Sequence, residues 1–451
     1  MRYAIDLFCG AGGMSEGILQ AGFHILFSSD ISEDVERTYT NRHEQLGYIQ
    51  GYNTYFKRCD VREITGNEIL EKIKGLKIFS NKEFEVPSEI DAIFGGPPCQ
   101  GFSRAGRRDP NDPRNLLFKE YLRVINEIKP KYVVMENVEG FNDTKFYNFI
   151  GLSNNIYEGE IYAPILLKEE LDKIGYSILE PRVLDASDYG VPQKRRRAIF
   201  IAYKKGLVAP KYPEPLYNEK NKVTVLDAVS DLTRMCNKTK YSNCDLTPYQ
   251  IESRRGRTKK INGEYPKYVQ EVKNVELSKH SDVIVERFSL YNEGEDSSQL
   301  KRRILSNGID LSNYPALVEE CSKKLNMNQE EVIRKFKNNE QNQEMVDALL
   351  TKKSIRTRLD RNKPSNTVVT LPDDYISPFE NRMFTVREMA RLQSFDDSFE
   401  FLGKRTTGGP RRKVEVPQYT QVGNAVPPLL AKAIANQIME ALLEGENNNI
   451  I

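Results

Sequence analysis

The stretch "DLFCGAGGMSEG" (Asp6–Gly17) joins the end of an apolar, strand-like run to the start of a helix-like segment. The loop between them carries Gly10, Gly12 and Gly13. Glycine lets a backbone approach a ligand where any Cβ would clash. The dinucleotide fingerprint GxGxxG is broken, because Ser15 holds its third glycine position. These residues alone leave two interpretations open, a structural turn and a ligand-binding loop.

Four more apolar runs follow in the first 205 residues, with helix-like segments between them. The runs are "HILFSSD" (24–30), "DAIFGG" (91–96), "KYVVMEN" (131–137) and "RRAIFIAY" (196–203). Continuous apolar strands that alternate with helices are typical of a mostly parallel sheet that is buried on both faces. The sequence therefore predicts an α/β fold, in which ligands bind beyond the carboxyl ends of the strands.

The regular pattern fades over residues 206–355 and then returns. A helical stretch is predicted inside this region at 314–350, and two further helices are predicted at 385–395 and 427–445. We expect the acidic, asparagine-rich end at 444–451 to be a frayed tail.

The composition is that of a globular chain, with 39% hydrophobic and 29% charged residues. No apolar run reaches the roughly 20 residues of a membrane span, and the N-terminus enters a strand-like run without a signal peptide. The six cysteines lack the spacing of a zinc site or a disulfide framework, so we expect no metal and a reducing, cytoplasmic setting. The net charge of +2 leaves any nucleic-acid binding to local basic clusters, and such clusters are most often solvated faces.

Two acids follow strand-like runs. Asp30 ends the second run, and Asp60 lies in "CDV" (59–61). A carboxylate at the first position can accept hydrogen bonds from ribose hydroxyls, and one at the second suits an exocyclic amine such as adenine N6. The alternative is that both acids are solvated strand ends or helix caps. With the glycine loop, they suggest an adenosine-bearing ligand.

The stretch "DAIFGGPPCQGFS" (91–103) places a cysteine directly after two prolines. Pro97 and Pro98 fix the backbone φ and remove two hydrogen-bond donors, so the thiol of Cys99 sits on a constrained turn. Nearby arginines favour the thiolate. Cys99 is therefore a candidate nucleophile, although a free cysteine is most often a small buried hydrophobe.

Glu136 and Asn137 end the next apolar run, on a strand expected to neighbour the one before Cys99. A thiolate with a nearby carboxylic acid is suited to addition to an electron-poor ring. Arg195 and Arg197, in "QKRRRAIF", share one face of an extended segment, where guanidinium donors can grip a ring carbonyl or a phosphate.

In chain order, these stretches resemble the motifs of the DNA (cytosine-5) methyltransferases. "DLFCGAGG" resembles the cofactor motif, "GGPPCQGFS" the nucleophile motif, "ENV" the glutamate motif and "DYGVPQKRRRAIF" the arginine motif. "REMARLQSF" resembles the motif that closes the recognition region, and "YTQVGNAVPPLLAKAIA" the last motif, which folds back onto the cofactor domain. The resemblance covers about 1–205 and 355–440, but not the middle of the chain.

The resemblance implies a fold and a division into three parts. The fold would be an α/β, Rossmann-like class I methyltransferase domain with a mostly parallel sheet, plus a smaller irregular target-recognition domain. The catalytic and S-adenosylmethionine-binding domain would span 1–205, and the variable target-recognition domain, with its helical insertion, 206–355. Residues 356–451 would hold the closing motif and the returning C-terminal helix.

The resemblance also implies roles for individual residues. Cys99 would be the nucleophile, Glu136 the acid near cytosine N3 and N4, and Arg197 the residue that holds the base carbonyl, supported by Arg195. The residues expected around the cofactor S-adenosylmethionine, which becomes S-adenosylhomocysteine, are Phe8, Gly10, Gly12, Gly13, Asp30, Ile31, Asp60, Val61, Pro98, Asn424 and Ala425. The residues expected to contact DNA, on a loop that closes over the flipped base, are Ser103, Arg104, Arg107 and Arg108. Arg196 stands where many members carry an acid, and we expect it to point away from the base.

The implied reaction is methylation of carbon 5 of cytosine in double-stranded DNA, by a monomer that has no membrane partner. Residues 206–355 would read the target sequence in the major groove. Further partners would be a cognate restriction endonuclease or phage-defence proteins. The alternatives are a tRNA cytosine-5 methyltransferase, whose usual Cys-Phe-Thr signature is absent, a catalytically inactive DNA-binding relative, and a nicotinamide oxidoreductase, disfavoured by the broken glycine spacing.

Overall fold

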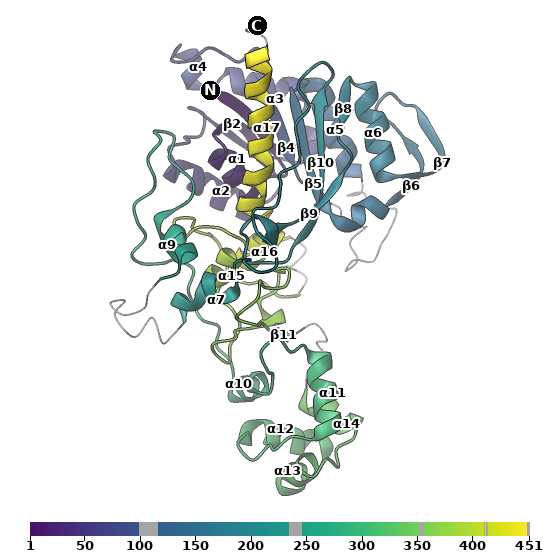
Figure 1. Cartoon of the computed structure of the whole chain (residues 1–451), viewed down its shortest axis with the longest axis vertical. Helices are drawn as coiled ribbons and strands as arrows, with labels where there is room; N and C mark the ends of the chain where they lie inside the picture. The colour runs from purple at the N-terminus through teal and green to yellow at the C-terminus, as the bar shows by residue number, and fades with distance from the viewer. Residues whose placement is uncertain (99–115, 234–245, 351–355, 410, 412–413, 449–451) are drawn as a thin grey trace.

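A computed structural model describes residues 1–98, 116–233, 246–350, 356–409, 411 and 414–448. Figure 1 shows a broad body that contains a large sheet, and a smaller unit of helices that projects from it. Within the described ranges, every helix is too short or too polar to traverse a lipid bilayer.

Among the described residues, eight strands form the sheet of the body, in the order β3-β2-β1-β4-β5-β10-β8, with β9 paired to β10 outside this path. The first five strands of that order run parallel, and β10 is antiparallel to β5. The strands are β1 (Arg2–Leu7), β2 (Phe23–Asp30), β3 (Tyr55–Arg58), β4 (Ala92–Gly95), β5 (Tyr132–Val138), β8 (Tyr176–Ile178), β9 (Arg182–Asp185) and β10 (Arg196–Lys204). The predicted α/β fold with a mostly parallel sheet is confirmed.

Helices cover both faces of this sheet. Ile5 and Ile93 belong to a core that they share with α3 (Gly66–Lys74), α5 (Leu117–Ile128) and α6 (Ala163–Lys173). The neighbouring strand residues Ala4 and Ala92 belong to a second core, with α1 (Gly13–Gln20) and α17 (Pro428–Asn448). Because successive strand residues point to opposite faces, the two cores lie on opposite sides of the sheet.

The first and last helices of the chain pack closely against each other (Figure 1). A Cβ added at Gly17 would lie 2.5 Å from the Cβ of Ala431, so only glycine permits this approach of α1 to α17. The helix α17 continues through Asn448, so the expectation of a frayed tail is wrong for 444–448. Residues 449–451 lie outside the described residues.

A third core lies beyond the carboxyl edge of the sheet and includes Ala11 of the glycine loop. Its helices are α7 (Val225–Val229), α15 (Val386–Leu392), α16 (Gln418–Asn424) and, through Tyr249, α9 (Pro248–Arg255). These segments lie far apart in the sequence, so the region before residue 280 and the region after residue 356 form one packed unit. The predicted domain boundaries at residues 205 and 355 stay predictions.

The projecting helices have a core of their own. They are α10 (Asp282–Ser289), α11 (Ser297–Asn307), α12 (Pro315–Leu325), α13 (Gln329–Lys337) and α14 (Gln343–Leu349). The predicted helical stretch is thus three helices, because Asn326 is left-handed (φ +50°) and the side chains of Asn328 and Asn342 cap the next two helices. A short parallel pair, β11 (Thr357–Arg358) and β12 (Tyr375–Ile376), leads back to the body.

Candidate active site

The glycine loop after β1 adopts a conformation that its sequence makes possible. Gly10 (φ +53°) and Gly12 (φ +100°) are left-handed, and so is Phe8 (φ +58°). The backbone N–H of Cys9 donates to the carbonyl oxygen of Ser29, 3.1 Å away, which fastens the loop to the end of β2. The loop therefore lies at the carboxyl edge of two adjacent parallel strands, where α/β proteins bind ligands.

Asp30 lies directly beside this loop. Its carboxylate accepts hydrogen bonds from the backbone N–H of Gly10 (3.1 Å) and of Ser32 (2.9 Å), while burial raises its pKa. The next residue, Ile31, is a large apolar side chain that is 67% exposed. The predicted cofactor residues Gly10, Asp30 and Ile31 are thus brought together, and an apolar side chain is left available to a flat ring.

Asp60 belongs to the adjoining loop, since the N–H of Cys59 donates to the carbonyl oxygen of Asp30 at 3.1 Å. Its carboxylate caps the short helix η1 (Val61–Glu63) and also accepts from Arg62 Nε at 2.9 Å. These hydrogen bonds from Arg62 hold its pKa below the usual range. Asp60 is therefore a helix cap, which was one of the two interpretations left open by the sequence. Val61 beside it is buried.

The C-terminal part reaches the same loop. Asn424 ends α16 and is exposed, and Ala425 after it is buried. A Cβ added at Gly13 would lie 2.3 Å from the carbonyl oxygen of Val426 and 3.0 Å from the Cβ of Ala425. Gly13 is thus a packing position between α1 and this segment.

Glu136 and Arg197 form an ion pair where β5 meets β10. Arg197 Nε lies 2.8 Å from Glu136 Oε1, and the two side chains are only 14% and 12% exposed. The other carboxylate oxygen faces the end of β4, because a Cβ added at Gly96 would lie 3.2 Å from it. Acid, guanidinium and the turn that leads to Cys99 therefore meet at one point.

Asn137 fixes that turn. Its Nδ2 donates to the carbonyl oxygen of Pro97 at 3.1 Å, and the side chain is buried. Pro98 is the last described residue before the gap. The predicted nucleophile and the predicted DNA-binding residues lie outside the described residues; these are Cys99, Ser103, Arg104, Arg107 and Arg108.

Arg195 is buried rather than open to a ligand. Its Nη1 donates to the carbonyl oxygen of Val368 (3.1 Å) and its Nη2 to that of Gly423 (3.0 Å). Burial and, to a smaller extent, the charge of Arg197 lower its pKa. The guanidinium of Arg195 therefore connects its own segment to the segments that contain Val368 and Gly423. Arg196 is exposed and pairs instead with Glu139 at 3.0 Å.

Two structural residues near the site were not predicted from the sequence. Gln193 is fully buried, donates from Nε2 to the carbonyl oxygen of Leu392 at 3.1 Å and accepts from the N–H of Val368 at 2.7 Å. Asp6 lies buried beneath the glycine loop, where burial raises its pKa to about 7, and Ser15 Oγ donates to it at 2.5 Å. The sequence shows that Gln193 and Asp6 lie within or next to the motifs. It does not show that their side chains are buried.

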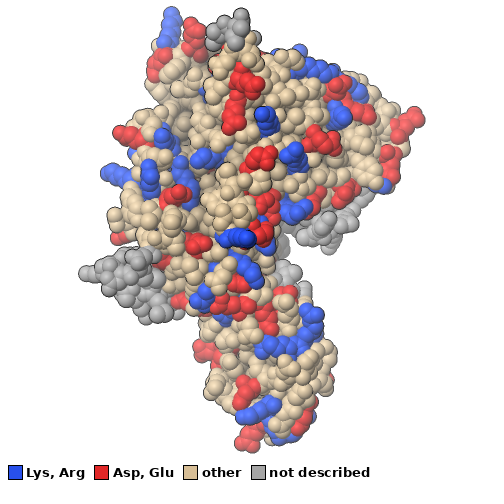
Figure 2. Space-filling model, in the orientation of Figure 1, with Lys and Arg blue, Asp and Glu red and all other residues tan. Residues whose placement is uncertain are grey.

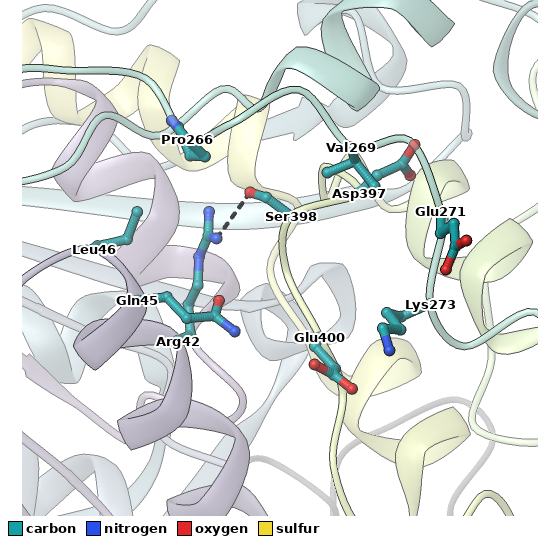
Figure 3. A pocket seen from close by; sticks show the side chains of 10 residues that line it. All are labelled: Arg42, Gln45, Leu46, Pro266, Val269, Glu271, Lys273, Asp397, Ser398 and Glu400. Atoms are coloured by element: carbon teal, nitrogen blue, oxygen red, sulfur yellow. Dashed lines mark hydrogen bonds between the residues drawn. The ribbon is translucent and has the colours of Figure 1, made fainter.

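A separate pocket of about 290 Å³ opens between the end of α2 (Glu33–Gln45) and the segment after α15. Figure 3 shows Arg42 in its wall, with Nη1 donating to Ser398 Oγ at 2.9 Å. None of the predicted site residues lines it. Among the described residues no group of three His, Cys, Asp or Glu could hold a metal ion, and the absence of a metal stays a prediction.

Known proteins resemble this chain along most of its length. The family model of the C-5 cytosine-specific DNA methylases matches residues 3–440. The Type II methyltransferase M.DdeI of Desulfomicrobium norvegicum is 30% identical over 443 residues, which cover 96% of this chain and 88% of that protein. The Type II methyltransferase M.XorII of Xanthomonas oryzae pv. oryzae is 31% identical over 449 residues, or 97% and 84% of the two chains. The crystal structure of a DNA modification methyltransferase encoded within an E. coli prophage shares the fold, with a TM-score of 0.60 and 23% identity over 98% of this chain and 100% of that one.

Proposed function

The chain belongs to the family of C-5 cytosine-specific DNA methylases and is a DNA methyltransferase, and we propose that it modifies cytosine within one specific duplex sequence through a transient bond from Cys99 to carbon 6. The observation that carries the proposal is the ion pair of Glu136 and Arg197 beside Gly96. It supports the proposal because an acid and a rigid hydrogen-bond donor lie beside Gly96, in the segment that precedes Cys99.

Enzymes of this family use S-adenosylmethionine, which supplies a methyl group on a positively charged sulfur. The residues at the carboxyl edge of β1, β2 and β3 fit such a group. The left-handed loop at Gly10 and Gly12 leaves room for close backbone approach. Asp30 offers a carboxylate to ribose hydroxyls, and the exposed Ile31 offers a surface to adenine. Asp60 would receive the exocyclic amine beside its contact with Arg62.

The chain's own residues then perform the remaining chemistry. The thiolate of Cys99 adds to carbon 6 of cytosine, and the carboxyl of Glu136 protonates or hydrogen-bonds N3. Arg197 holds the base carbonyl through its guanidinium and keeps Glu136 in place. Carbon 5 thereby becomes nucleophilic and takes the methyl group. Loss of the carbon 5 proton to solvent, return of the N3 proton to Glu136 and departure of the Cys99 thiolate restore the ring.

The target carbon is stacked within duplex DNA, so the base must leave the helix at a cost of a few kcal/mol. We assign the closing loop to residues 103–115 and the reading of the sequence to residues 206–355. Relatives named Type II methyltransferases support a role beside a cognate restriction endonuclease, or in phage defence, in a bacterial cytoplasm. The chain would act on DNA as a monomer.

Bisulfite sequencing of DNA from a host that expresses the chain tests the proposal directly. We expect protected cytosines in one sequence context, and none from a host that expresses Cys99→Ser. Protected cytosines in both hosts would remove Cys99 from the mechanism. Methylation on an amino nitrogen would overturn the reaction itself.

Duplex DNA that carries 5-fluorocytosine in this context tests the covalent step. Fluorine cannot leave as a proton does, so the adduct with Cys99 should persist. We expect a complex that survives denaturing electrophoresis with the wild-type chain and not with Cys99→Ser. An active enzyme that forms no such complex would contradict the covalent route.

A further inference from the structure

A tyrosine is buried where two segments of the candidate site leave the sheet. Tyr121 lies on α5, whose other buried side chains are aliphatic or phenylalanine, and it is 0% exposed. A buried hydroxyl needs a hydrogen-bond partner, which a phenylalanine at the same position would not need. Filling of the core therefore does not by itself explain the tyrosine.

The hydroxyl of Tyr121 fastens α5 to the two neighbouring strands β4 and β5. It donates to the carbonyl oxygen of Val134 on β5 at 2.8 Å, and it lies 3.3 Å from that of Ile93 on β4. Burial and, to a smaller extent, the charge of Asp6 raise the pKa of Tyr121, so the hydroxyl keeps its proton and remains a donor. The hydrogen bonds thus fix the ring relative to both strands.

The ring of Tyr121 rests directly on the last residue of β4. A Cβ added at Gly95 would lie 2.6 Å from Cε2 of Tyr121 and 3.1 Å from the carbonyl oxygen of Leu7. Glycine is thus required for this contact, since any side chain would displace the ring. The turn that leads to Cys99 (residues 95–98) begins at Gly95, so the ring supports the start of that turn.

The same ring packs against the glycine loop, which begins at Phe8. Strands β1 and β4 are adjacent, with Leu7 opposite Gly95, so the loop and the turn leave the sheet side by side. Phe8 is left-handed (φ +58°), a strained conformation for a residue with a large side chain. Its ring centroid lies 6.4 Å from that of Tyr121, which is the spacing of an aromatic pair. Tyr121 therefore helps to keep Phe8 in this conformation.

We propose that Tyr121 is a positioning residue for methyl transfer, which holds the glycine loop at Phe8 and the turn at Gly95 in a fixed relation to each other. The inference rests on the proposed function and adds a residue that is buried away from both the base and the cofactor. A group transfer between two bound molecules is sensitive to their relative placement, and a misplacement of about 1 Å can cost about 100-fold in rate. One ring in contact with both segments links the two placements.

The experiment compares Tyr121→Leu with the wild type in two measurements on the full chain. Calorimetric titration with S-adenosylhomocysteine should show an affinity about tenfold weaker, because the support of the strained Phe8 is lost. Single-turnover methylation at saturating cofactor and DNA should be about 100-fold slower, because the turn before Cys99 also shifts. Tyr121→Phe keeps the ring and loses only its hydrogen bonds, so it should lose less than about tenfold in either measurement.

The matched control is Tyr176→Leu. Tyr176 belongs to the same core, is 1% exposed and donates its hydroxyl to the carbonyl oxygen of Pro130 at 2.6 Å. Pro130 lies before β5, whereas Glu136 lies near the other end of that strand. We expect similar losses of thermal stability in the two Leu variants, but wild-type cofactor affinity and rate in Tyr176→Leu.

Affinity for duplex DNA provides a second check. Figure 2 shows Lys, Arg, Asp and Glu side chains spread over the surface of the body, and the fully buried Tyr121 contributes nothing to that surface. Tyr121→Leu should therefore bind a short fluorescent duplex as the wild type does, with the same dependence on salt. A variant that loses duplex affinity in proportion to its rate would contradict the proposal, because a damaged DNA-binding surface would then explain the slower rate.

Wild-type affinity and rate in a folded Tyr121→Leu would overturn the proposal, as would equal losses in Tyr176→Leu. A loss in only one of the two measurements would contradict the link between the segments. If Tyr121→Leu does not fold, Tyr121→Met, which retains more of the side-chain volume, is measured in its place.

The two measurements also separate this failure from that of the proposed function. A wild-type chain that methylates cytosine no faster than Tyr121→Leu contradicts the role of Tyr121 alone. A wild-type chain that binds S-adenosylhomocysteine more tightly than Tyr121→Leu does, yet methylates no cytosine, contradicts the proposed chemistry.

Discussion

Asn137 Nδ2 donates a hydrogen bond to the carbonyl oxygen of Pro97 at 3.1 Å, across 40 residues of chain. The bond fastens the turn that precedes Cys99 to the end of β5, directly after Glu136. In the proposed mechanism Cys99 and Glu136 act on the same ring, so this amide would help to set their relative position. Small errors in such a position affect the chemical step more than binding.

Asn137→Asp removes the N–H donor and sets a carboxylate against the carbonyl of Pro97. We expect kcat to fall about 100-fold while the KM for S-adenosylmethionine changes little. Steady-state methylation assays measure both. The control is Asn53→Asp, because Asn53 Nδ2 also donates to a backbone carbonyl, that of Gly47 at 2.9 Å, but lies before β3, an edge strand that is distant from β5 in the sheet. Equal losses of kcat would refute a specific role for Asn137.

Glu136→Gln keeps the shape of the side chain but cannot deliver a proton to N3. We expect kcat to fall by about 100-fold to 10,000-fold, the range for removing a general acid. Single-turnover methyl transfer is the measurement. Glu139→Gln is the matched control, since Glu139 pairs with Arg196 at 3.0 Å as Glu136 pairs with Arg197 at 2.8 Å. Wild-type rates for Glu136→Gln would exclude it as the acid.

Arg195→Met leaves the carbonyl oxygens of Val368 and Gly423 buried without their donors. We expect the free energy of unfolding to fall by about 3 kcal/mol, because each unsatisfied buried group costs about 1–3 kcal/mol. Urea denaturation measures it. Arg196→Met, at an exposed ion pair, should stay within about 0.5 kcal/mol of the wild type. Similar losses in the two variants would mean that Arg195 does not hold the distant segments together.

His43 makes stability depend on pH. Its ring stacks on Tyr39 with centroids 4.0 Å apart, and burial lowers its pKa to about 3. The unfolded chain, with a His pKa of about 6.5, binds the proton more readily, so this contribution to stability falls as the pH drops from about 6.5 towards 3. The slope is at most about 1.4 kcal/mol per pH unit.

His43→Gln removes this titration. Urea denaturation of both chains at pH values of about 7 and about 5 should show the wild-type advantage shrinking at the lower pH. Other titrating groups are shared by the two chains, so they cancel in the difference. Parallel stability curves would show that His43 is not kept neutral by folding.

Five strands of the sheet and the residues at their ends were predictable from the sequence, because apolar runs and glycine turns are local signals. The order of the strands in the sheet, and the short strands β3, β8 and β9, were not predicted. Asp30, Glu136 and the turn before Cys99 all lie where a parallel sheet places the ends of its strands. The contact between Glu136 and Arg197 was harder to foresee. It depends on the antiparallel register of β10 against β5, in which Arg197 lies opposite Val138.

Long-range hydrogen bonds were beyond prediction from the sequence. Arg195 was expected on the same face as Arg197, yet its partners lie 173 and 228 residues away. No local pattern specifies such partners, since they arise only when the returning segment packs against β10. The helical stretch at 314–350 differs, because its division into separate helices has a local signal. Asn326 is left-handed and Asn328 caps the next helix, and asparagine is favoured at both kinds of position.

The packing of α17 on α1 has a consequence for synthesis. Ribosomes make the chain from its N-terminus, so the face of the sheet that α17 covers stays open until the middle of the chain and the final helix have emerged. The N-terminal half therefore cannot complete its core early, and a truncated nascent chain would expose apolar surface to chaperones and proteases. Helix α17 is thus the last element of this core to leave the ribosome.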